Sequence, residues 1–139
     1  MTRIRYHRCV EAEELLHELS LIIGINLKVK VGAIVSREAR ARAYARIYGL
    51  ASAIQIAHSL PPLYTVEFIC ERALKLDKET LTEVAIHELL HIPETQKGGL
   101  RPHGKKVNSI ATKKLLKKVD SEFEEEFHKA IENCCASLA

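Results

Sequence analysis

Two histidines that flank a glutamate are the residues of this chain best suited to chemistry: His87-Glu88-Leu89-Leu90-His91. On a helix, residues four apart lie on the same face, so both imidazoles can point at one metal ion. Glu88 lies about 100° further round such a helix, where its carboxylate can reach a water on that ion. The spacing therefore predicts a zinc-dependent hydrolase, with His87 and His91 as metal ligands and Glu88 as the catalytic residue.

A third metal ligand must come from elsewhere in the chain. A catalytic zinc usually has three protein ligands and leaves its fourth position to water. Residues 94–102 contain two adjacent glycines and a proline, and such a turn-forming stretch can bring the chain back beneath the helix. We therefore expect His103 to complete the site for a single Zn²⁺ ion. Asp120 and Glu122 are the acidic alternatives, and they rank below His103.

The histidine pair needs a helix to position it, and the flanking residues predict one. Asp77 stands where an N-cap belongs, and Glu79 supplies the acidic first turn that the helix dipole favours. Pro93 follows shortly after the motif and ends the helix, because proline lacks the N–H that continues it. Apolar residues recur at helical spacing around the motif, namely Leu81, Val84, Ala85 and Ile92.

The residues before this helix predict one more helix and several strands. Residues 9–21 are amphipathic with the helical period, whereas residues 25–31 alternate with the strand period. Residues 40–48 also alternate, and we interpret them as a strand, although their alanines would equally suit a helix. A short strand is expected within residues 50–57, and residues 64–70 alternate as a further strand directly before the active-site helix.

Basic residues are concentrated in two parts of the chain. The predicted strand over 40–48 presents arginines and tyrosines on one face, a combination able to stack on bases. Every charged residue from 97 to 118 is Lys or Arg, whereas those from 120 to 126 are Asp or Glu. Solvent-exposed faces are the simpler interpretation of both. The alternative is a phosphate-binding surface near the metal, with an affinity that falls steeply as salt rises.

The C-terminal part predicts a long helix packed behind the site. Apolar side chains recur there every four residues, which gives a continuous buried stripe. The residues that form it are Val107, Ala111, Leu115, Val119, Phe123, Phe127 and Ile131.

Several segments of the sequence resemble segments of a known protein family. His87–His91 and Arg101-Pro102-His103-Gly104, with the glycine-bearing loop between them, are similar to the active-site segment of SprT-like zincin metallopeptidases, especially the compact ones of archaea and phages. Ala45–Leu50 and Tyr64–Phe68 are similar to that family's strands before the active-site helix. The resemblance covers roughly residues 40 to 110. The spacing between His91 and His103 in the sequence is shorter than in several better-known members, and no zinc-ribbon cysteine set follows.

The resemblance implies a site and a way of binding substrate. One zinc ion would be held by His87, His91 and His103, with Glu88 as general base. An edge strand beside the active-site helix would pair with an extended peptide substrate. Either the strand over 64–70 or the preceding one would form that edge. Apart from the resemblance, Tyr64, Tyr48 and Arg101 are the candidate donors for the oxyanion, and no spacing selects among them.

Length and composition fit one α+β domain over residues 1–139. With 139 residues, 47% of them hydrophobic, the chain can bury a core but is too short for two ordinary domains. We expect a small zincin-like domain with an N-terminal helix, a short mostly antiparallel sheet, the active-site helix and a long C-terminal helix. No apolar run is long enough for a membrane span, and the N-terminus is charged rather than signal-like.

The cysteines and the site together set the remaining expectations. The four cysteines, at 9, 70, 134 and 135, show no Cys-x-x-Cys spacing, so we expect reduced thiols and a cytoplasmic location. Neighbouring Cys134 and Cys135 are not expected to bond to each other. The expected partner is a polypeptide substrate. The alternative functions are a metal-dependent nuclease, a nucleic-acid-binding zinc protein that uses the basic segment 97–118, and a helical domain that binds no metal. The sequence leaves the oligomeric state open.

Overall fold

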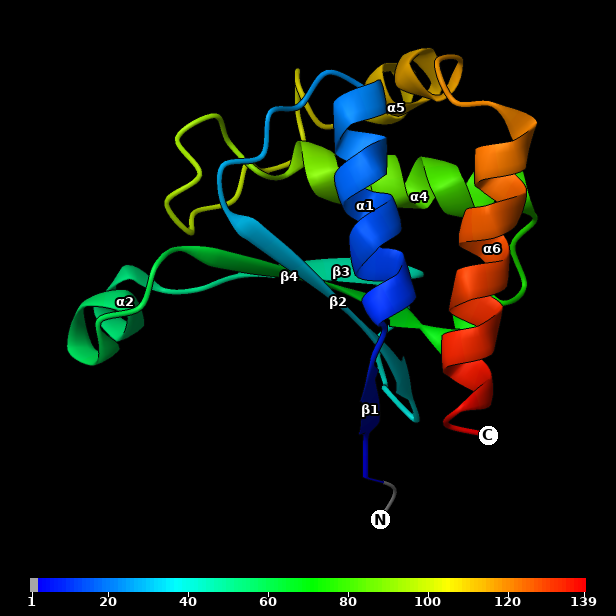
Figure 1. Cartoon of the computed structure of the whole chain (residues 1–139), viewed down its shortest axis with the longest axis horizontal. Coiled ribbons are helices and arrows are strands. Elements are labelled where there is room, and N and C mark those ends of the chain that lie inside the picture. Colours follow the sequence, from blue (N-terminus) through cyan, green and yellow to red (C-terminus); the bar gives the residue numbers. More distant parts are fainter. Residues whose placement is uncertain (1–2) are drawn as a thin grey trace.

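A four-stranded mixed sheet carries the main helices on one of its faces (Figure 1). The computed structural model describes residues 3–139. The strand order is β1 (Arg5–Arg8), β2 (Lys30–Arg37), β4 (Leu63–Ile69) and β3 (Ala45–Gly49). β1 pairs with β2 and β3 with β4 in antiparallel fashion, whereas β2 and β4 are parallel. The predicted α+β class with a mostly antiparallel sheet is therefore confirmed.

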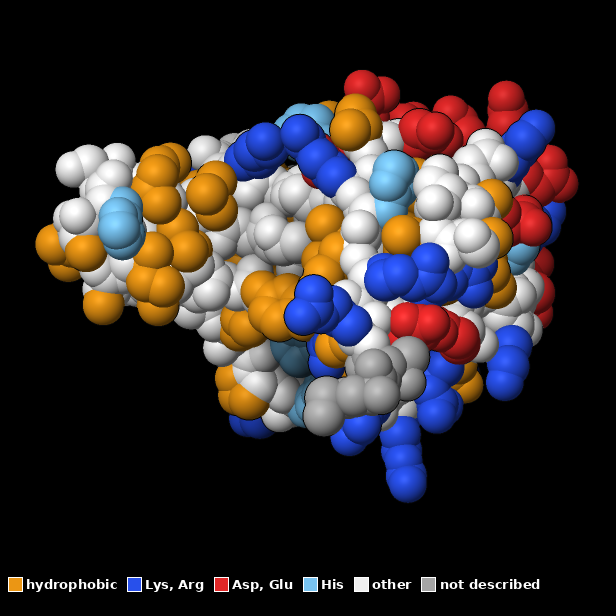
Figure 2. All heavy atoms as spheres, turned by 90° about the horizontal axis from the view of Figure 1, so that it is seen from below, with side chains coloured by type: hydrophobic (Ala, Val, Ile, Leu, Met, Phe, Trp, Pro, Cys, Tyr) orange, Lys and Arg blue, Asp and Glu red, His pale blue; other side chains and the backbone are white. Residues whose placement is uncertain are grey.

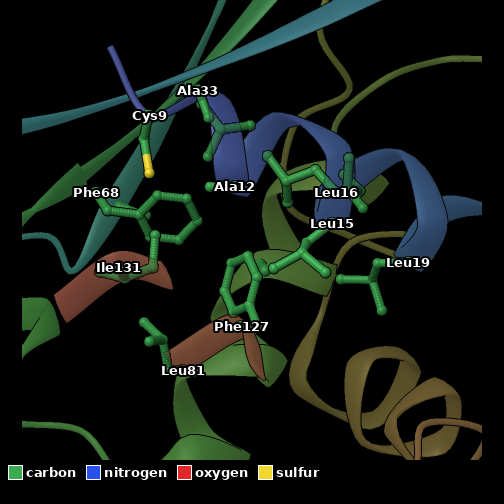
Figure 3. Packing of buried hydrophobic residues seen from close by; sticks show 14 of the residues in the cluster. Cys9, Ala12, Leu15, Leu16, Leu19, Ala33, Phe68, Leu81, Phe127 and Ile131 are labelled. Atoms are coloured by element: carbon green, nitrogen blue, oxygen red, sulfur yellow. The ribbon is translucent and has the colours of Figure 1, made fainter. Parts of the chain in front are cut away.

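Three long helices cover the sheet and enclose the core. They are α1 (Val10–Ile22), α4 (Lys78–Leu90) and α6 (Ser121–Ala136). The shorter helices are α2 (Ser52–His58), α3 (Cys70–Ala73) and α5 (Ser109–Leu116). Phe68 of β4 meets Phe127 of α6 edge to face, with 5.6 Å between ring centroids. Leu16 of α1 and Leu81 of α4 are fully buried around this pair (Figure 3). Within the described chain, no helix is long and apolar enough to cross a membrane.

Two disulfides attach α6 to the rest of the fold, so the prediction of reduced thiols is wrong. Cys9 bonds to Cys134 and Cys70 bonds to Cys135. Neighbouring cysteines on α6 thus reach two different elements, the N-cap of α1 and the start of α3. The Cα atoms are 5.7 and 5.8 Å apart, within the usual range for a disulfide. Sequence spacing could not show this, because the partners are 125 and 65 residues apart.

Before α4, two strands have bounds that differ from the predicted ones. The strand expected over 25–31 starts only at Lys30, because the Gln96 side chain bonds to the backbone of Asn26 and Lys28 in place of a neighbouring strand. The strand expected over 40–48 is formed only from Ala45, after a loop in which Glu38 has a φ of 67°. The strand predicted over 64–70 is confirmed in β4, and α1 confirms the first helix.

Two further predictions about elements were wrong. The short strand expected within 50–57 is the helix α2, which projects from the sheet on the β3–β4 connection (Figure 1). The single C-terminal helix is instead α5 followed by α6. It breaks between them because the Asp120 carboxylate accepts a hydrogen bond from the backbone N–H of Phe123 and starts a new helix as its N-cap. Two short elements, β1 and α3, were not predicted.

Candidate metal centre and active-site cleft

Helix α4 presents His87 and His91 on one face. Its N-cap is Asp77, whose carboxylate accepts a hydrogen bond from the Thr80 N–H, as the sequence predicts. The helix ends at Leu90, and His91 is the C-cap with φ −68° and ψ −16°, still helical values. The rings of His87 and His91 therefore stand one turn apart, with their centroids separated by 4.9 Å.

The loop after α4 brings the His103 ring to the same place. Nε2 of His87 lies 3.0 Å from Nε2 of His103 and 3.3 Å from Nε2 of His91. Candidate ligand atoms of all three residues lie within 4.8 Å of one another. Zinc bound tetrahedrally at about 2.0–2.1 Å would hold its nitrogen ligands about 3.3 Å apart. The donor set therefore fits a zinc ion, both in chemistry and in spacing.

A carbonyl oxygen sets the orientation of His91. Nδ1 of His91 lies 2.6 Å from the Arg101 carbonyl, which can only accept, so Nδ1 carries the proton. Nε2 then offers a lone pair toward the other two rings. The Arg101 N–H in turn donates to the His91 carbonyl at 2.6 Å. Such an outer contact typically orients a metal-binding imidazole, and here it also joins the loop to the end of α4.

Burial and neighbouring imidazoles favour neutral ligands. The pKa of His87 is lowered, first by burial and then by His91 and His103 nearby. A lowered pKa keeps the imidazole neutral at physiological pH, which is the form that binds metal.

Glu88 lies in the same cleft and has an unusual acidity. Its side chain is 6% exposed, and burial raises its pKa to about 7. A carboxylate with a pKa near neutrality can both take and release a proton at physiological pH. Glu88 is therefore suited to acid–base work beside the three histidines.

The cleft runs between α4, the edge strand β3 and the loop that carries His103. Its volume is about 1000 Å³. The lining residues are Ala43, Tyr44, Ala45, Arg46, Ile47, Thr80, Glu83, Val84, His87, Glu88, His91, Leu100, Arg101, Pro102, His103, Ser109, Thr112 and Lys113. Apolar atoms form most of the exposed surface of the cleft, and the candidate metal ligands and Glu88 are among its lining residues.

Strand β3, rather than β4, forms the edge of the sheet beside this cleft. In the β3–β4 pair, the Ile69 N–H donates to the Tyr44 carbonyl and the Leu50 N–H to the Leu63 carbonyl. Antiparallel pairing alternates, so the main-chain groups of Ala45 and Ile47 point outward, away from β4. Of the two edge candidates in the sequence, the structure leaves the earlier strand exposed.

The loop between the histidines is held by contacts that the sequence pattern did not suggest. The buried Tyr64 hydroxyl accepts from the Gly98 N–H at 2.8 Å and donates to the Gly99 carbonyl at 2.9 Å. Gly49 and Gly98 touch so closely that a Cβ added to Gly49 would lie 2.0 Å from the Gly98 oxygen. The two glycines are compatible with such a close backbone contact, but the sequence does not show that Gly49 and Gly98 meet.

The other residues singled out in the sequence lie in different places. Arg101 lines the cleft, but the Tyr64 hydroxyl binds the loop and the Tyr48 hydroxyl donates to Glu67, so neither tyrosine is an oxyanion donor here. Asp120 caps α6 and is not part of the histidine group. Glu122 is likewise outside that group. Of the basic residues in 97–118, only Arg101 and Lys113 line the cleft.

Comparison with known families agrees with a metal-dependent peptidase. Residues 5–132 match the family described as "Putative phage metallopeptidase". The chain belongs to this family. The match extends from β1 almost to the end of α6, so it includes the sheet, the cleft and all three histidines. No curated protein and no solved structure matches the chain.

Membership of a metallopeptidase family implies a metal ion and a polypeptide substrate. Within residues 3–139, His87, His91 and His103 are the one group of His, Cys, Asp or Glu side chains spaced to hold a metal. They line the same cleft as the outward edge of β3, where an extended chain can pair.

Proposed function

We propose that the protein is a zinc-dependent, SprT-like zincin peptidase in which His87, His91 and His103 hold one Zn²⁺ ion and Glu88 is the general base. The observation that carries this proposal is the convergence of three imidazole Nε2 atoms beside a buried carboxylate in a single cleft. Membership of the phage metallopeptidase family supports the peptidase activity, but not the identity of the metal or the roles of single residues.

The residues of the cleft divide the chemistry between them. A zinc ion held by His87, His91 and His103 would supply an acidified water and would polarise the scissile carbonyl. Glu88 accepts the water proton and delivers it to the leaving amine, for which a pKa of about 7 suits it. The Arg101 carbonyl keeps His91 in the tautomer that presents Nε2. The guanidinium of Arg101, which lines the cleft, is one cation that could interact with a developing oxyanion, and Lys113 is another.

The edge strand provides a binding mode that requires few particular side chains. An extended peptide laid beside β3 would form main-chain hydrogen bonds with Ala45 and Ile47. The scissile bond would then lie between β3 and the histidines of α4, because both line the cleft.

Parallel measurements of zinc content and casein cleavage test the proposal. Glu88→Gln should keep about one zinc per chain and lose cleavage by about 10²- to 10⁴-fold, because only proton transfer is removed. His103→Ala should lose zinc as well as activity. Glu79→Gln, an exposed glutamate on the same helix, is the matched control and should behave as the wild type. Normal cleavage by Glu88→Gln, or full zinc binding by His103→Ala, would contradict the assignment.

A further inference from the structure

An uncharged, exposed lobe projects from the sheet next to the cleft. This apolar lobe comprises residues 50–62, which include α2, and Figure 2 shows hydrophobic side chains gathered on it. No Asp, Glu, Lys or Arg occurs between Arg46 and Glu67. Helix α2 buries none of its residues, and Ile54, Ile56 and Leu60 are 45%, 81% and 42% exposed. Contiguous apolar surface of this kind on a small protein marks an interaction site.

Two segments connect the apolar lobe to the cleft. Strand β3 lines the cleft through residues 45–47 and then leads directly into the lobe. The loop that carries His103 touches the lobe as well, because the Gln55 side chain donates to the Lys97 carbonyl at 3.0 Å. Leu100 of the same loop lines the cleft and is 42% exposed, so apolar surface belongs to the cleft as well as the lobe.

We propose that the apolar lobe is a second binding site for the polypeptide substrate and selects substrates with an apolar segment on the N-terminal side of the cleaved bond. This inference rests on the proposed function, because it uses the cleft as the place of cleavage. A strand rises about 3.3 Å per residue, and the lobe begins three positions after Ile47, the last residue of β3 that lines the cleft, so a paired peptide reaches the lobe about three residues beyond the cleft.

The direction of the substrate follows from the pairing. Antiparallel pairing is the more stable arrangement, and β3 runs from the cleft toward the lobe. An antiparallel substrate therefore runs from the lobe toward the cleft, which puts its N-terminal residues on the lobe. The absence of charge across 47–66 favours aliphatic side chains there over charged ones.

Peptide length and composition test the inference. A short fluorogenic peptide that fills only the cleft is compared with versions extended by six residues, either aliphatic or polar, at the N-terminal or the C-terminal side. We expect only the aliphatic N-terminal extension to raise kcat/KM, by about tenfold and through KM. An Ile54→Ser, Ile56→Ser double variant should reduce this gain to within twofold of the polar extension. Equal gains from all extensions, or an unchanged gain in the double variant, would overturn the inference.

A matched control and a binding assay keep the result interpretable. Ile110 of α5 is also 81% exposed, and Ile110→Ser should leave the gain intact. Fluorescence anisotropy with Glu88→Gln measures binding of the same peptides without turnover. If no peptide is cleaved but the aliphatic one binds through Ile54 and Ile56, the proposed function fails, and the apolar lobe is a peptide-binding site without a role in cleavage. If peptides are cleaved and bind equally, only the second site fails.

Two further measurements test whether the apolar lobe binds something other than the substrate. Co-sedimentation with phosphatidylcholine vesicles, or a dimer mass in sedimentation velocity, would be measured for wild type and the Ile54→Ser, Ile56→Ser variant. If the variant loses one of these interactions but keeps the gain from the aliphatic extension, the apolar lobe binds a membrane or a second copy of the chain and not the substrate.

Discussion

Glu67 is a fully buried carboxylate. Its neighbour Phe68 packs against α6, so by strand alternation Glu67 lies on the face of the sheet away from the main helices. Its oxygens accept hydrogen bonds from the Ser36 hydroxyl at 2.6 Å, the Tyr48 hydroxyl at 2.6 Å and the Arg46 guanidinium at 2.9 and 3.2 Å. Burial opposes ionisation, but the hydrogen bonds from Arg46, Ser36 and Tyr48 outweigh it and hold the pKa of Glu67 below its usual value. Burial and the bond to Glu67 raise the pKa of Tyr48 to about 12.

Substitution of Glu67 should therefore have a pH-dependent cost. A hydrogen bond to a charged group contributes about 1.5–3 kcal/mol, so Glu67→Gln should lower the free energy of unfolding by about that amount at pH 7. Because the folded pKa is the lower one, this contribution is present above the unfolded pKa of about 4.3 and is lost as pH falls through the folded value.

Urea unfolding at pH 7 and near pH 3 measures this difference. Glu14→Gln, at an exposed position of α1, serves as the control and should change stability by less than about 0.5 kcal/mol at either pH. A Glu67 variant that is as stable as the wild type at pH 7, or equally destabilised at both pH values, would refute this account.

The loop over residues 94–103 is positioned by neighbouring elements. The Gln96 side chain ties it to residues 26–28, the Tyr64 hydroxyl ties it to β4, and Gly98 packs against the end of β3. Gly98 has a φ of +105°, a conformation that L side chains rarely adopt. The position of His103 therefore depends on a close approach between backbones that only glycine permits.

The two adjacent glycines of this loop provide a paired test. A Cβ at Gly98 would lie 2.3 Å from the Leu50 oxygen, whereas one at Gly99 would meet no atom within 4 Å. Gly98→Ala should displace the loop and weaken zinc binding by at least about tenfold, a size typical of lost outer support for a ligand. Gly99→Ala should bind zinc as the wild type does. Zinc affinity is measured by competition with a chromophoric chelator, and equal affinities for the two variants would argue against this role of the loop.

At the scale of the whole molecule, α6 is linked covalently to the N-cap of α1 and to the start of α3. The Cys9–Cys134 bond closes almost the entire chain, and the Cys70–Cys135 bond closes its C-terminal half. A disulfide that closes a long loop restricts the unfolded ensemble and typically stabilises a protein by about 2–4 kcal/mol. All four cysteines are buried, so the bonds also belong to the packed core.

Removal of either disulfide should lower stability with little change at the metal centre. Cys9→Ala with Cys134→Ala, and separately Cys70→Ala with Cys135→Ala, should each lower the free energy of unfolding by about 2–5 kcal/mol. Urea unfolding with and without reductant checks this, and a variant without all four cysteines should be insensitive to reductant. Alkylation of four thiols after unfolding in urea without reductant, seen by mass spectrometry, would show that the bonds are absent.

Local patterns in the sequence determined α1, α4 and β4, because caps and apolar periodicity act between residues close along the chain. The same reasoning nominated His87, Glu88, His91 and His103, since helical spacing and a glycine loop are local features too. Only the tertiary structure decided which strand is the edge, that residues 52–58 form a helix, where the C-terminal helix divides and how the cysteines pair. The edge strand and the pairing of the cysteines depend on contacts between residues far apart in the chain, which periodicity does not report. The division of the C-terminal helix depends on the local cap at Asp120, which apolar periodicity does not report either.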